Sequence, residues 1–315
     1  MLLTAERVLF DGLVDYAGLF PPAQLAMDAA VAEYRGARRG PHAWILGRFI
    51  CPASRLEELA ESLTRTMRHE DAPWALSVVL DGNPAEGATL ARAFEAEMSP
   101  AAIVDIVEAR LPPQASDGRP SSSAAAELRG TVSAALSVSP TVRPYLEVAV
   151  GDAWRDGIGN ALAALSVAGA AELRTIGAKI RCGGAHQSDF PTSAQLAAFL
   201  VGCARNDLPF KATAGLHHPI RHVDEALGAM RHGFVNLLFA AALASEGEDE
   251  VAVAAILSET ENSAFSVVAS RLSWRGRAVG LPALKRLRAE GFVAFGSCNF
   301  DEPVEDLLDL RMIAR

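Results

Sequence analysis

Short apolar runs alternate along the chain with longer stretches in which apolar residues recur every three or four positions. Short apolar runs bounded by turn residues are typical of buried strands, and the longer period is typical of helices that bury one face. Strands that alternate with helices form βαβ units and a parallel sheet. The pattern predicts eight strands: Leu13–Leu19, Ile45–Cys51, Ala75–Leu80, Ala102–Val107, Pro144–Val150, Ala178–Cys182, Pro209–Ala214 and Phe292–Ser297.

Two of the intervening segments begin with a helix-capping pattern. Ser54–Arg68 opens with a serine that is followed three residues later by Glu57, and Thr192–Asn206 opens in the same way. Eight strands with helices between them predict an α/β fold, a closed (β/α)8 TIM barrel. An open doubly wound sheet is the alternative, but no predicted strand is followed by a GxGxxG or GxxxxGK[ST] phosphate loop.

Two segments interrupt this alternation. Pro112–Ser123 is rich in Pro, Ser and Gly and predicts a mobile loop. Phe234–Gly280 is too long for one connection and contains an apolar run, an acidic stretch, a helix and a small hairpin around Leu272–Arg277. We therefore expect residues 1–315 to form a single domain in which 234–280 is an insertion before the last strand. Such an insertion would serve as a lid or as a contact between copies in a homo-oligomer.

Composition restricts the class of protein. Half of the residues are apolar and 21% are charged, which excludes a disordered chain. The net charge of −9 argues against nucleic acid or an anionic membrane as the partner. Charged residues near the start argue against a secretory signal, and the four cysteines form no CxxC pair. We expect a cytoplasmic protein that acts on a small molecule.

Lysine is rare in this chain, and its placement is informative. Only three of the 29 basic residues are lysines. Lys285 lies in a basic helical segment, whereas Lys179 and Lys211 lie in the apolar strands GAKIRCGG and PFKATAG. Unlike arginine, a lysine can lose its proton and attack a carbonyl carbon. The alternative is that each strand lysine extends toward solvent or pairs with a carboxylate.

An acid lies in another apolar strand. Asp105 is flanked by Ile103, Val104, Ile106 and Val107, and a carboxylate in such a setting requires a cation or a proton-transfer partner. Together with the two strand lysines it predicts an acid–amine–amine site. One lysine would form an imine, the second would lower the pKa of the first, and the acid would relay protons.

Six segments, in order, carry a resemblance to a known family: VDYAGLFPPA, GRFICPAS, IVDIVE, AKIRCGG, PFKATAGLHH and VAFGSCNF. In these segments the chain resembles the deoxyribose-phosphate aldolase family of class I aldolases. The resemblance implies a TIM barrel in which Asp105 is the proton relay, Lys179 forms the Schiff base and Lys211 is the second lysine. It also implies that groups after the last strands bind the substrate.

The chain departs from that family where the family binds a phosphate. Asp301 and Glu302 follow the last strand, and carboxylates there would repel a phosphate dianion. Arg181 replaces a small hydroxyl residue and favours a carboxylate. We therefore expect a Schiff-base lyase that acts on a small, carboxylated, unphosphorylated carbonyl compound without a cofactor. The expected substrate-binding residues are Asp15, Arg181, Gly183, Gly184, Thr213, Gly215, His217, His218, Ser297 and Asn299.

Other interpretations remain at this point. His217, His218 and His222 form an HHxxxH pattern, which a metal-assisted hydrolase could use, although the pattern lacks the HExxH glutamate and we expect no metal. Gly183 and Gly184 form either a backbone nest for an anion or only a turn. A third alternative is a non-catalytic binding barrel.

Overall fold

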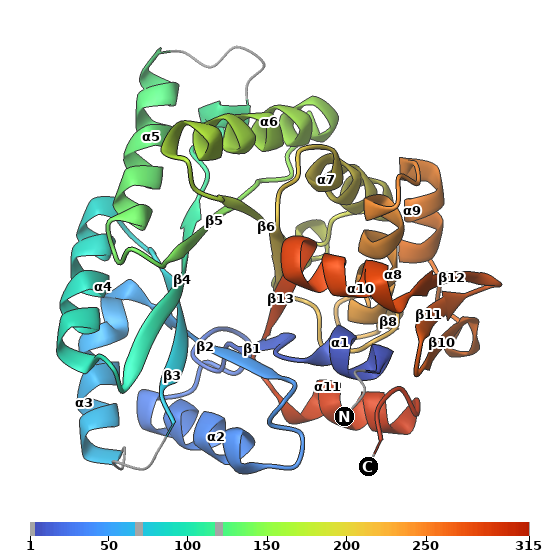
Figure 1. Ribbon diagram of the computed structural model, residues 1–315, viewed down its shortest axis with the longest axis horizontal. Coiled ribbons are helices and arrows are strands. Elements are labelled where there is room, and N and C mark those ends of the chain that lie inside the picture. Colours follow the sequence, from blue (N-terminus) through green and yellow to red (C-terminus); the bar gives the residue numbers. More distant parts are fainter. Residues whose placement is uncertain (1–3, 67–71, 117–121, 315) are drawn as a thin grey trace.

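Eight parallel strands close into a barrel in the computed structural model, which describes residues 4–66, 72–116 and 122–314 (Figure 1). Around the barrel the strands follow the order β1-β13-β7-β6-β5-β4-β3-β2. The (β/α)8 TIM barrel predicted from the sequence is therefore confirmed. The barrel strands are β1 (Val14–Tyr16), β2 (Leu46–Pro52), β3 (Trp74–Val79), β4 (Ala102–Arg110), β5 (Arg143–Glu147), β6 (Gly177–Arg181), β7 (Phe210–Thr213) and β13 (Phe292–Ser297).

Each barrel strand overlaps one of the runs predicted from the sequence. β4 is longer than predicted and continues past the predicted end at Val107 to Arg110. The extra residues include Glu108, whose charge ends the apolar run in the sequence although the strand itself continues. This extension places two more charged side chains in the barrel wall.

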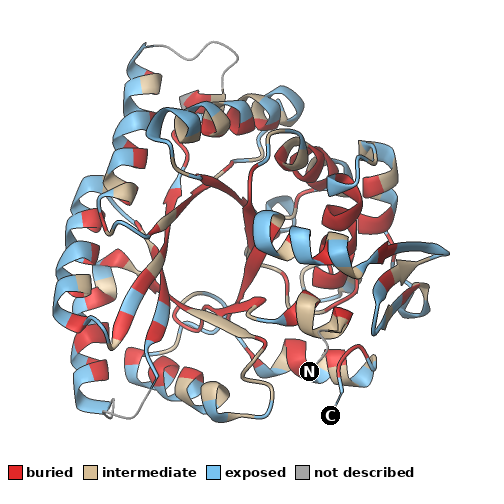
Figure 2. Ribbon diagram, viewed as in Figure 1, coloured by how far each residue is buried: buried red, intermediate tan, exposed pale blue. Residues whose placement is uncertain are grey.

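Helices surround the barrel, with their buried sides against the strands and their exposed sides outward (Figure 2). Thr192 caps α7 through the predicted capping box with Gln195. Ser54 Oγ instead donates to Asp81 Oδ2 at 2.5 Å, and Asp81 lies two residues after the end of β3. Helix α3 begins at Leu56, two residues after Ser54. The helices are α1 (Ala5–Phe10), α2 (Met27–Arg39), α3 (Leu56–Thr66), α4 (Pro84–Met98), α5 (Ser122–Leu136), α6 (Trp154–Glu172), α7 (Ser193–Arg205), α8 (Phe234–Ser245), α9 (Glu250–Leu257), α10 (Leu281–Arg286) and α11 (Asp301–Asp309).

The connection from β7 to β13 contains the extra elements. It begins with the antiparallel hairpin of β8 (His222–Asp224) and β9 (Ala229–Arg231). Next, α8 packs against α7, α9 and β13 and is buried along almost its whole length. A three-stranded antiparallel sheet follows, made of β10 (Phe265–Val268), β11 (Arg271–Trp274) and β12 (Arg277–Gly280). The hairpin expected around Leu272–Arg277 is thus confirmed as β11 and β12.

The expected loop at Pro112–Ser123 lies partly outside the described residues. The described part holds a 3-10 turn at Pro113–Ser116, and α5 begins at Ser122. The two ends of the chain lie close together, and Ala314 N donates to Glu6 Oε1 at 3.2 Å (Figure 1). Among the described residues, no helix has both the length and the apolar character needed to cross a membrane.

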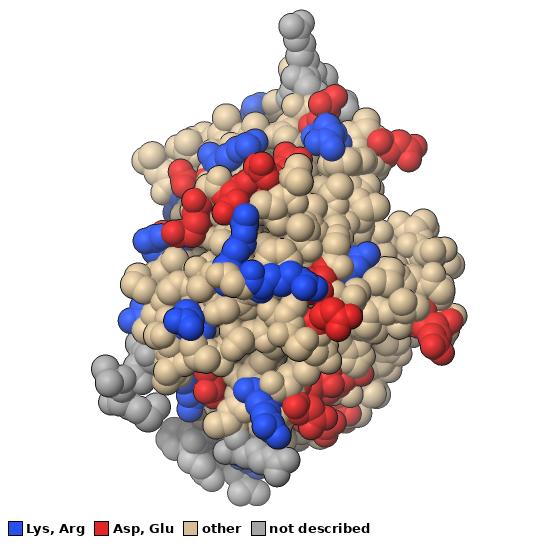
Figure 3. Space-filling view, turned by 90° about the vertical axis from the view of Figure 1, so that its right-hand side faces the viewer, with Lys and Arg blue, Asp and Glu red and all other residues tan. Residues whose placement is uncertain are grey.

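Acidic and basic side chains are interspersed on the face that carries α9 and the β10–β12 sheet (Figure 3). Ion pairs account for part of this mixing, such as Arg277 with Glu248 at 3.0 Å and Arg286 with Glu246 at 2.6 Å. Exposed pairs of this kind contribute little to stability, and this face offers no large region of a single sign. The concentrated charge of the protein lies inside the barrel instead.

Candidate active site

Strand alternation separates an apolar layer outside the barrel from a charged interior. Successive residues of a strand point to opposite faces, so the residues next to an outward-pointing residue point toward the barrel axis. The outward residues belong to the core between strands and helices: Val107 and Ala109 on β4, Leu146 on β5 with Val148 directly after it, and Ala178 and Ile180 on β6. Between them, Glu108, Glu147 and Lys179 point inward and form part of the charged interior.

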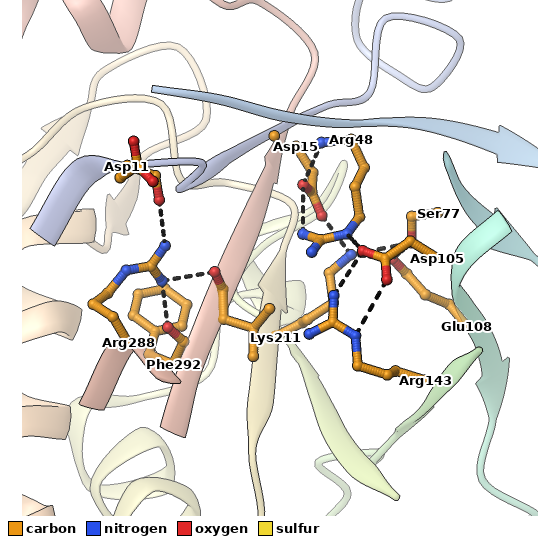
Figure 4. Close-up of polar contacts among 12 residues, drawn as sticks. Asp11, Asp15, Arg48, Ser77, Asp105, Glu108, Arg143, Lys211, Arg288 and Phe292 are labelled. Carbon is orange, nitrogen blue, oxygen red and sulfur yellow. Dashed lines mark hydrogen bonds and ion pairs between the residues drawn. The ribbon is translucent and has the colours of Figure 1, made fainter. Parts of the chain in front are cut away.

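Lys211 is a fully satisfied cation at the centre of this interior (Figure 4). Its side chain is 2% exposed. Its Nζ donates to Asp15 Oδ2 at 2.6 Å, Glu108 Oε1 at 2.7 Å and Ser77 Oγ at 3.1 Å. An ammonium has three hydrogens, and these three acceptors use all of them. Lys211 therefore acts as a fixed positive charge that holds β1, β3, β4 and β7 together.

Lys179 lies directly beside Lys211 in the register of β6 and β7. Its Nζ contacts Glu108 Oε2 at 2.8 Å and Glu147 Oε2 at 2.9 Å, so Glu108 bridges the two lysines. Glu147 is the most exposed of the three, at 16% of its side chain. Since these two carboxylates are the partners of Lys179 among the described residues, one ammonium hydrogen remains available to a ligand.

Burial and charge act in opposite directions on these groups. Burial alone would lower the pKa of Lys179, but Glu108 and Glu147 raise it above its ordinary value. Burial alone would raise the pKa of Glu108, but Lys179 and Lys211 hold it well below its ordinary value. At neutral pH both groups are therefore charged in the resting site.

Asp105, the acid expected between the lysines, lies elsewhere in the barrel. Its Oδ2 accepts from Arg48 Nε and from Arg143 Nη2, both at 2.6 Å (Figure 4). Asp105 precedes Glu108 by three residues, which is about 10 Å along a strand. Burial would raise the pKa of Asp105, but the two guanidinium groups lower it. The carboxylate that contacts both lysines is Glu108, which is a correction to the expected acid–amine–amine arrangement.

A register shift explains how Asp105 and Glu108, three positions apart on β4, both point into the barrel. Along β3 and β4, Leu76 pairs with Val104 but Ser77 pairs with Ile106, so Asp105 is the extra residue of a bulge. In a regular strand, residues three positions apart point to opposite faces. Both acids have apolar neighbours in the sequence. Nothing in the sequence of this segment indicates the bulge that decides which way each of them points.

The interior charges form one connected chain. In order they are Glu147, Lys179, Glu108, Lys211, Asp15, Arg48, Asp105 and Arg143, with each in contact with the next. Four acids alternate with four cations, so the chain is neutral as a whole. A buried network of this kind is tolerated because every charge meets an opposite one. Five residues of this candidate site are not predicted by the sequence pattern: Ser77, Glu108, Glu147, Arg48 and Arg143.

Asp15 is held in place by the main chain of β2. Arg48 N donates to Asp15 Oδ1 at 2.7 Å. The preceding Gly47 lies so close that a Cβ there would be 2.3 Å from Asp15 Oδ1 and 3.0 Å from Gly12 O. Glycine at this position therefore leaves the room in which the Asp15 carboxylate meets Lys211.

We expect Gly47→Ala to destabilise the protein by about 1–3 kcal/mol, because the added methyl group must displace the Asp15 carboxylate or the main chain. Chemical denaturation at pH 7 would measure the change. Gly82→Ala is the matched control, because a Cβ at Gly82 meets nothing within 4 Å. Equal stability of the two variants would contradict the role assigned to Gly47.

The histidines after β7 pair with acids of α11. His217 Nδ1 and Glu302 Oε2 are hydrogen-bonded at 2.9 Å, and His218 Nδ1 and Asp306 Oδ2 at 2.6 Å. Burial lowers the pKa of His217. His222 begins β8, so it shares no helix face with His218, although their rings pack edge to face at 4.5 Å. Across the part of the chain that the structure describes, no group of three or more His, Cys, Asp or Glu residues is arranged to hold a metal ion.

The expected glycine nest has the contacts of a tight turn. A Cβ at Gly183 would be 2.6 Å from the Phe190 ring, and a Cβ at Gly184 would be 2.4 Å from Asp189 Oδ2. Gly215 has a φ of 71°, and a Cβ there would be 3.1 Å from Gly183 Cα. The ends of β6 and β7 therefore approach closely, and an acidic side chain occupies the space beside Gly184. These contacts favour the turn over an anion nest.

The remaining expected residues divide into two groups. Ser297 and Asn299 shape the start of α11: Ser297 Oγ donates to Asn299 O at 2.6 Å, and Asn299 Oδ1 accepts from Glu302 N at 3.1 Å. Thr213 and Arg181 follow the two lysines by two residues and point inward at the carboxyl ends of their strands. Substrates of TIM barrels meet the protein at that end.

Comparison with known proteins adds no family assignment. A scan against protein-family models finds no match for this chain, and a search of curated proteins finds none either. The TIM barrel is shown by strand order and closure alone. The aldolase resemblance is a hypothesis about chemistry, to be judged by the side chains in the barrel.

Proposed function

We propose that this protein is a lysine-dependent lyase in which Lys179 forms an imine with a small, carboxylated, unphosphorylated carbonyl compound. One observation carries the proposal: the carboxylate of Glu108 bridges Lys179 Nζ at 2.8 Å and Lys211 Nζ at 2.7 Å inside the barrel. Two adjacent amines provide a nucleophile and a fixed cation, and Glu147, the second carboxylate in contact with Lys179, provides a proton carrier.

Lys179 is the better nucleophile of the two lysines because it has two hydrogen-bond acceptors where Lys211 has three. One of its two acceptors, Glu147, is also more exposed than the carboxylates beside Lys211. Lys211 donates its three ammonium hydrogens to Asp15, Glu108 and Ser77, which leaves none for a ligand. Lys179 has 8% of its side chain exposed, and its neighbour Glu147 has 16%. A carbonyl compound entering from the carboxyl ends of the strands would therefore meet Lys179 first.

The reaction begins with a proton transfer, because only the neutral amine attacks. Lys179 Nζ passes a proton to Glu147, and its lone pair then bonds to the carbonyl carbon. The resulting carbinolamine takes up a proton on oxygen and loses water to give an iminium ion. With a β-hydroxy carbonyl substrate, Glu147, once it has given its proton to the departing water, takes the proton of the β-hydroxyl group. The bond between the α- and β-carbons breaks and its electron pair moves into the iminium, which leaves an enamine and a second carbonyl product. Protonation of the enamine and hydrolysis of the imine release the first product and restore Lys179.

Borohydride trapping tests this proposal. The protein is incubated with a panel of small aldehydes and 2-oxo acids, reduced, and analysed by intact mass and peptide mapping. A reduced adduct on the peptide that contains Lys179, with Lys211 unmodified, is the expected result. Absence of an adduct with every compound would overturn the imine chemistry and favour a barrel that binds ligands without reacting.

We expect trapping to become faster as the pH rises, because the raised pKa of Lys179 leaves little neutral amine near pH 7. Below that pKa the neutral fraction grows about tenfold for each pH unit. Glu147→Gln removes one of the carboxylates that raise the pKa, so its rate profile should bend at a lower pH. Adduct formation at exposed Lys285 in the same samples is the internal control. A profile unchanged by Glu147→Gln would contradict the coupling of these two groups.

A further inference from the structure

Two arginines stand at the carboxyl ends of the strands that carry the site. Arg110 ends β4 and follows Glu108 by two residues, and Arg181 ends β6 and follows Lys179 by two residues. Both are exposed, in contrast to the buried charges below them. The direction in which they point follows from their neighbours, because the residues on either side of each arginine pack in the apolar core outside the barrel.

The alternation around both arginines is unambiguous. Ala109 and Leu111 flank Arg110, and Ile180 and Cys182 flank Arg181; all four belong to the apolar layer between strands and helices. The arginine between each pair must point to the opposite side, which is the barrel interior. Both guanidinium groups therefore extend from the inner face of the barrel into its open end.

Neither arginine has an acid to neutralise it among the residues that the structure describes. Arg110 is directly opposite Glu147 in the register of β4 and β5. Glu147, however, is engaged by Lys179 at 2.9 Å. The chain of interior charges below is already balanced, with four acids and four cations. Arg110 and Arg181 therefore add two uncompensated positive charges at the entrance to the lysine site.

We propose that Arg110 and Arg181 together bind the two carboxylates of a dicarboxylate. The arginines stand on β4 and β6, two strands apart and about 10 Å between strand axes. In the register, Glu147 on the intervening β5 pairs with Arg110 on one side and with Lys179 on the other, and Arg181 follows Lys179 by two residues. A ligand held at both ends would lie across Lys179. If the imine chemistry above holds, on which this last step rests, the substrate is a short oxo dicarboxylic acid whose carbonyl is presented to that amine. Arginine suits this role because its planar guanidinium binds carboxylates in a bidentate manner.

Glutarate tests the binding site without the chemistry, because it has two carboxylates and no carbonyl. Isothermal titration of the full chain should show glutarate binding at least about tenfold tighter than butyrate, which has one carboxylate. Arg110→Gln and Arg181→Gln should each weaken glutarate binding by about tenfold or more and leave butyrate within a few-fold. Arg129→Gln is the matched control, since Arg129 is an exposed arginine on α5.

The outcomes separate this inference from the imine chemistry. Glutarate that binds no tighter than butyrate, or that binds equally to wild type and Arg110→Gln, would overturn the dicarboxylate site whatever the trapping shows. Arginine-dependent glutarate binding in a protein that traps no carbonyl compound would establish the site and remove the lyase proposal. Thermal melting is the control for folding. Both variants should melt as the wild type does, because the replaced side chains are exposed.

Discussion

We expect Lys179→Arg to abolish the borohydride-trapped adduct and to lower carbon–carbon bond cleavage to below about one thousandth of the wild-type rate. Arginine keeps the positive charge that Glu108 and Glu147 require, but it stays protonated and cannot form an imine. Loss of a nucleophile removes the covalent route rather than weakening it, so the effect on turnover exceeds that of any other single change proposed for this site. The measurement is trapping and turnover with the carbonyl compound that gives the strongest wild-type adduct.

Lys285→Arg is the matched control, because it makes the same exchange in an exposed helical segment. It should trap and turn over as the wild type does. Circular dichroism and thermal melting establish whether Lys179→Arg retains the barrel. Should the larger side chain prevent folding, the mapped position of the adduct in the wild-type protein decides the question. An adduct on Lys211 or Lys285 alone, or normal turnover by Lys179→Arg, would refute the assignment of Lys179 as the nucleophile.

We expect Lys211→Met to destabilise the protein by about 3–5 kcal/mol, the range found when one partner of a buried ion pair is removed. The thioether has nearly the length of the lysine stem but supplies no charge, so Asp15 and Glu108 lose their common partner. Both carboxylates are buried, with side chains 0% and 3% exposed. Guanidinium-induced unfolding at pH 7 measures the loss.

Two comparisons test whether the loss of stability arises from the negative charge of Asp15 and Glu108 that Lys211 no longer balances. Lys285→Met should change the free energy of unfolding by no more than about 0.5 kcal/mol, because that lysine is exposed. Adding Glu108→Gln to Lys211→Met should restore part of the stability, since it makes the numbers of buried acids and cations equal again. A loss below about 1 kcal/mol for Lys211→Met, or a double variant less stable than the single one, would contradict the central role of Lys211.

The rarity of lysine was the most useful feature of the sequence for locating the site. Two lysines in successive apolar strands predicted paired amines, and the structure places Lys179 and Lys211 side by side in the register. The carboxylate that contacts both lysines is Glu108, whereas the sequence pattern predicts Asp105 there. That assignment depended on regular alternation in β4, which the bulge at Asp105 interrupts.

The arginines illustrate a different limit. Arg181 could be predicted as inward-facing because it follows Lys179 by two residues in one strand. Arg110 could not, because the apolar run ends at Val107 and β4 continues for three more residues. Arg48 shows the limit most clearly, since its partners Asp15 and Asp105 belong to two other strands. The pairing of β1, β2, β3 and β4 side by side in the barrel brings these three side chains together.

Local patterning was sufficient for the architecture of this protein: the period of apolar residues specifies strands and helices, and their alternation specifies a parallel barrel. The same pattern also selected the two interior lysines, because a charged residue in an apolar strand must point inward to a partner. The pairing of charges depended on tertiary structure. Coulomb energy in a buried site depends on separations of a few ångströms, and those separations follow from register, the β4 bulge and barrel closure, which join residues far apart in the chain.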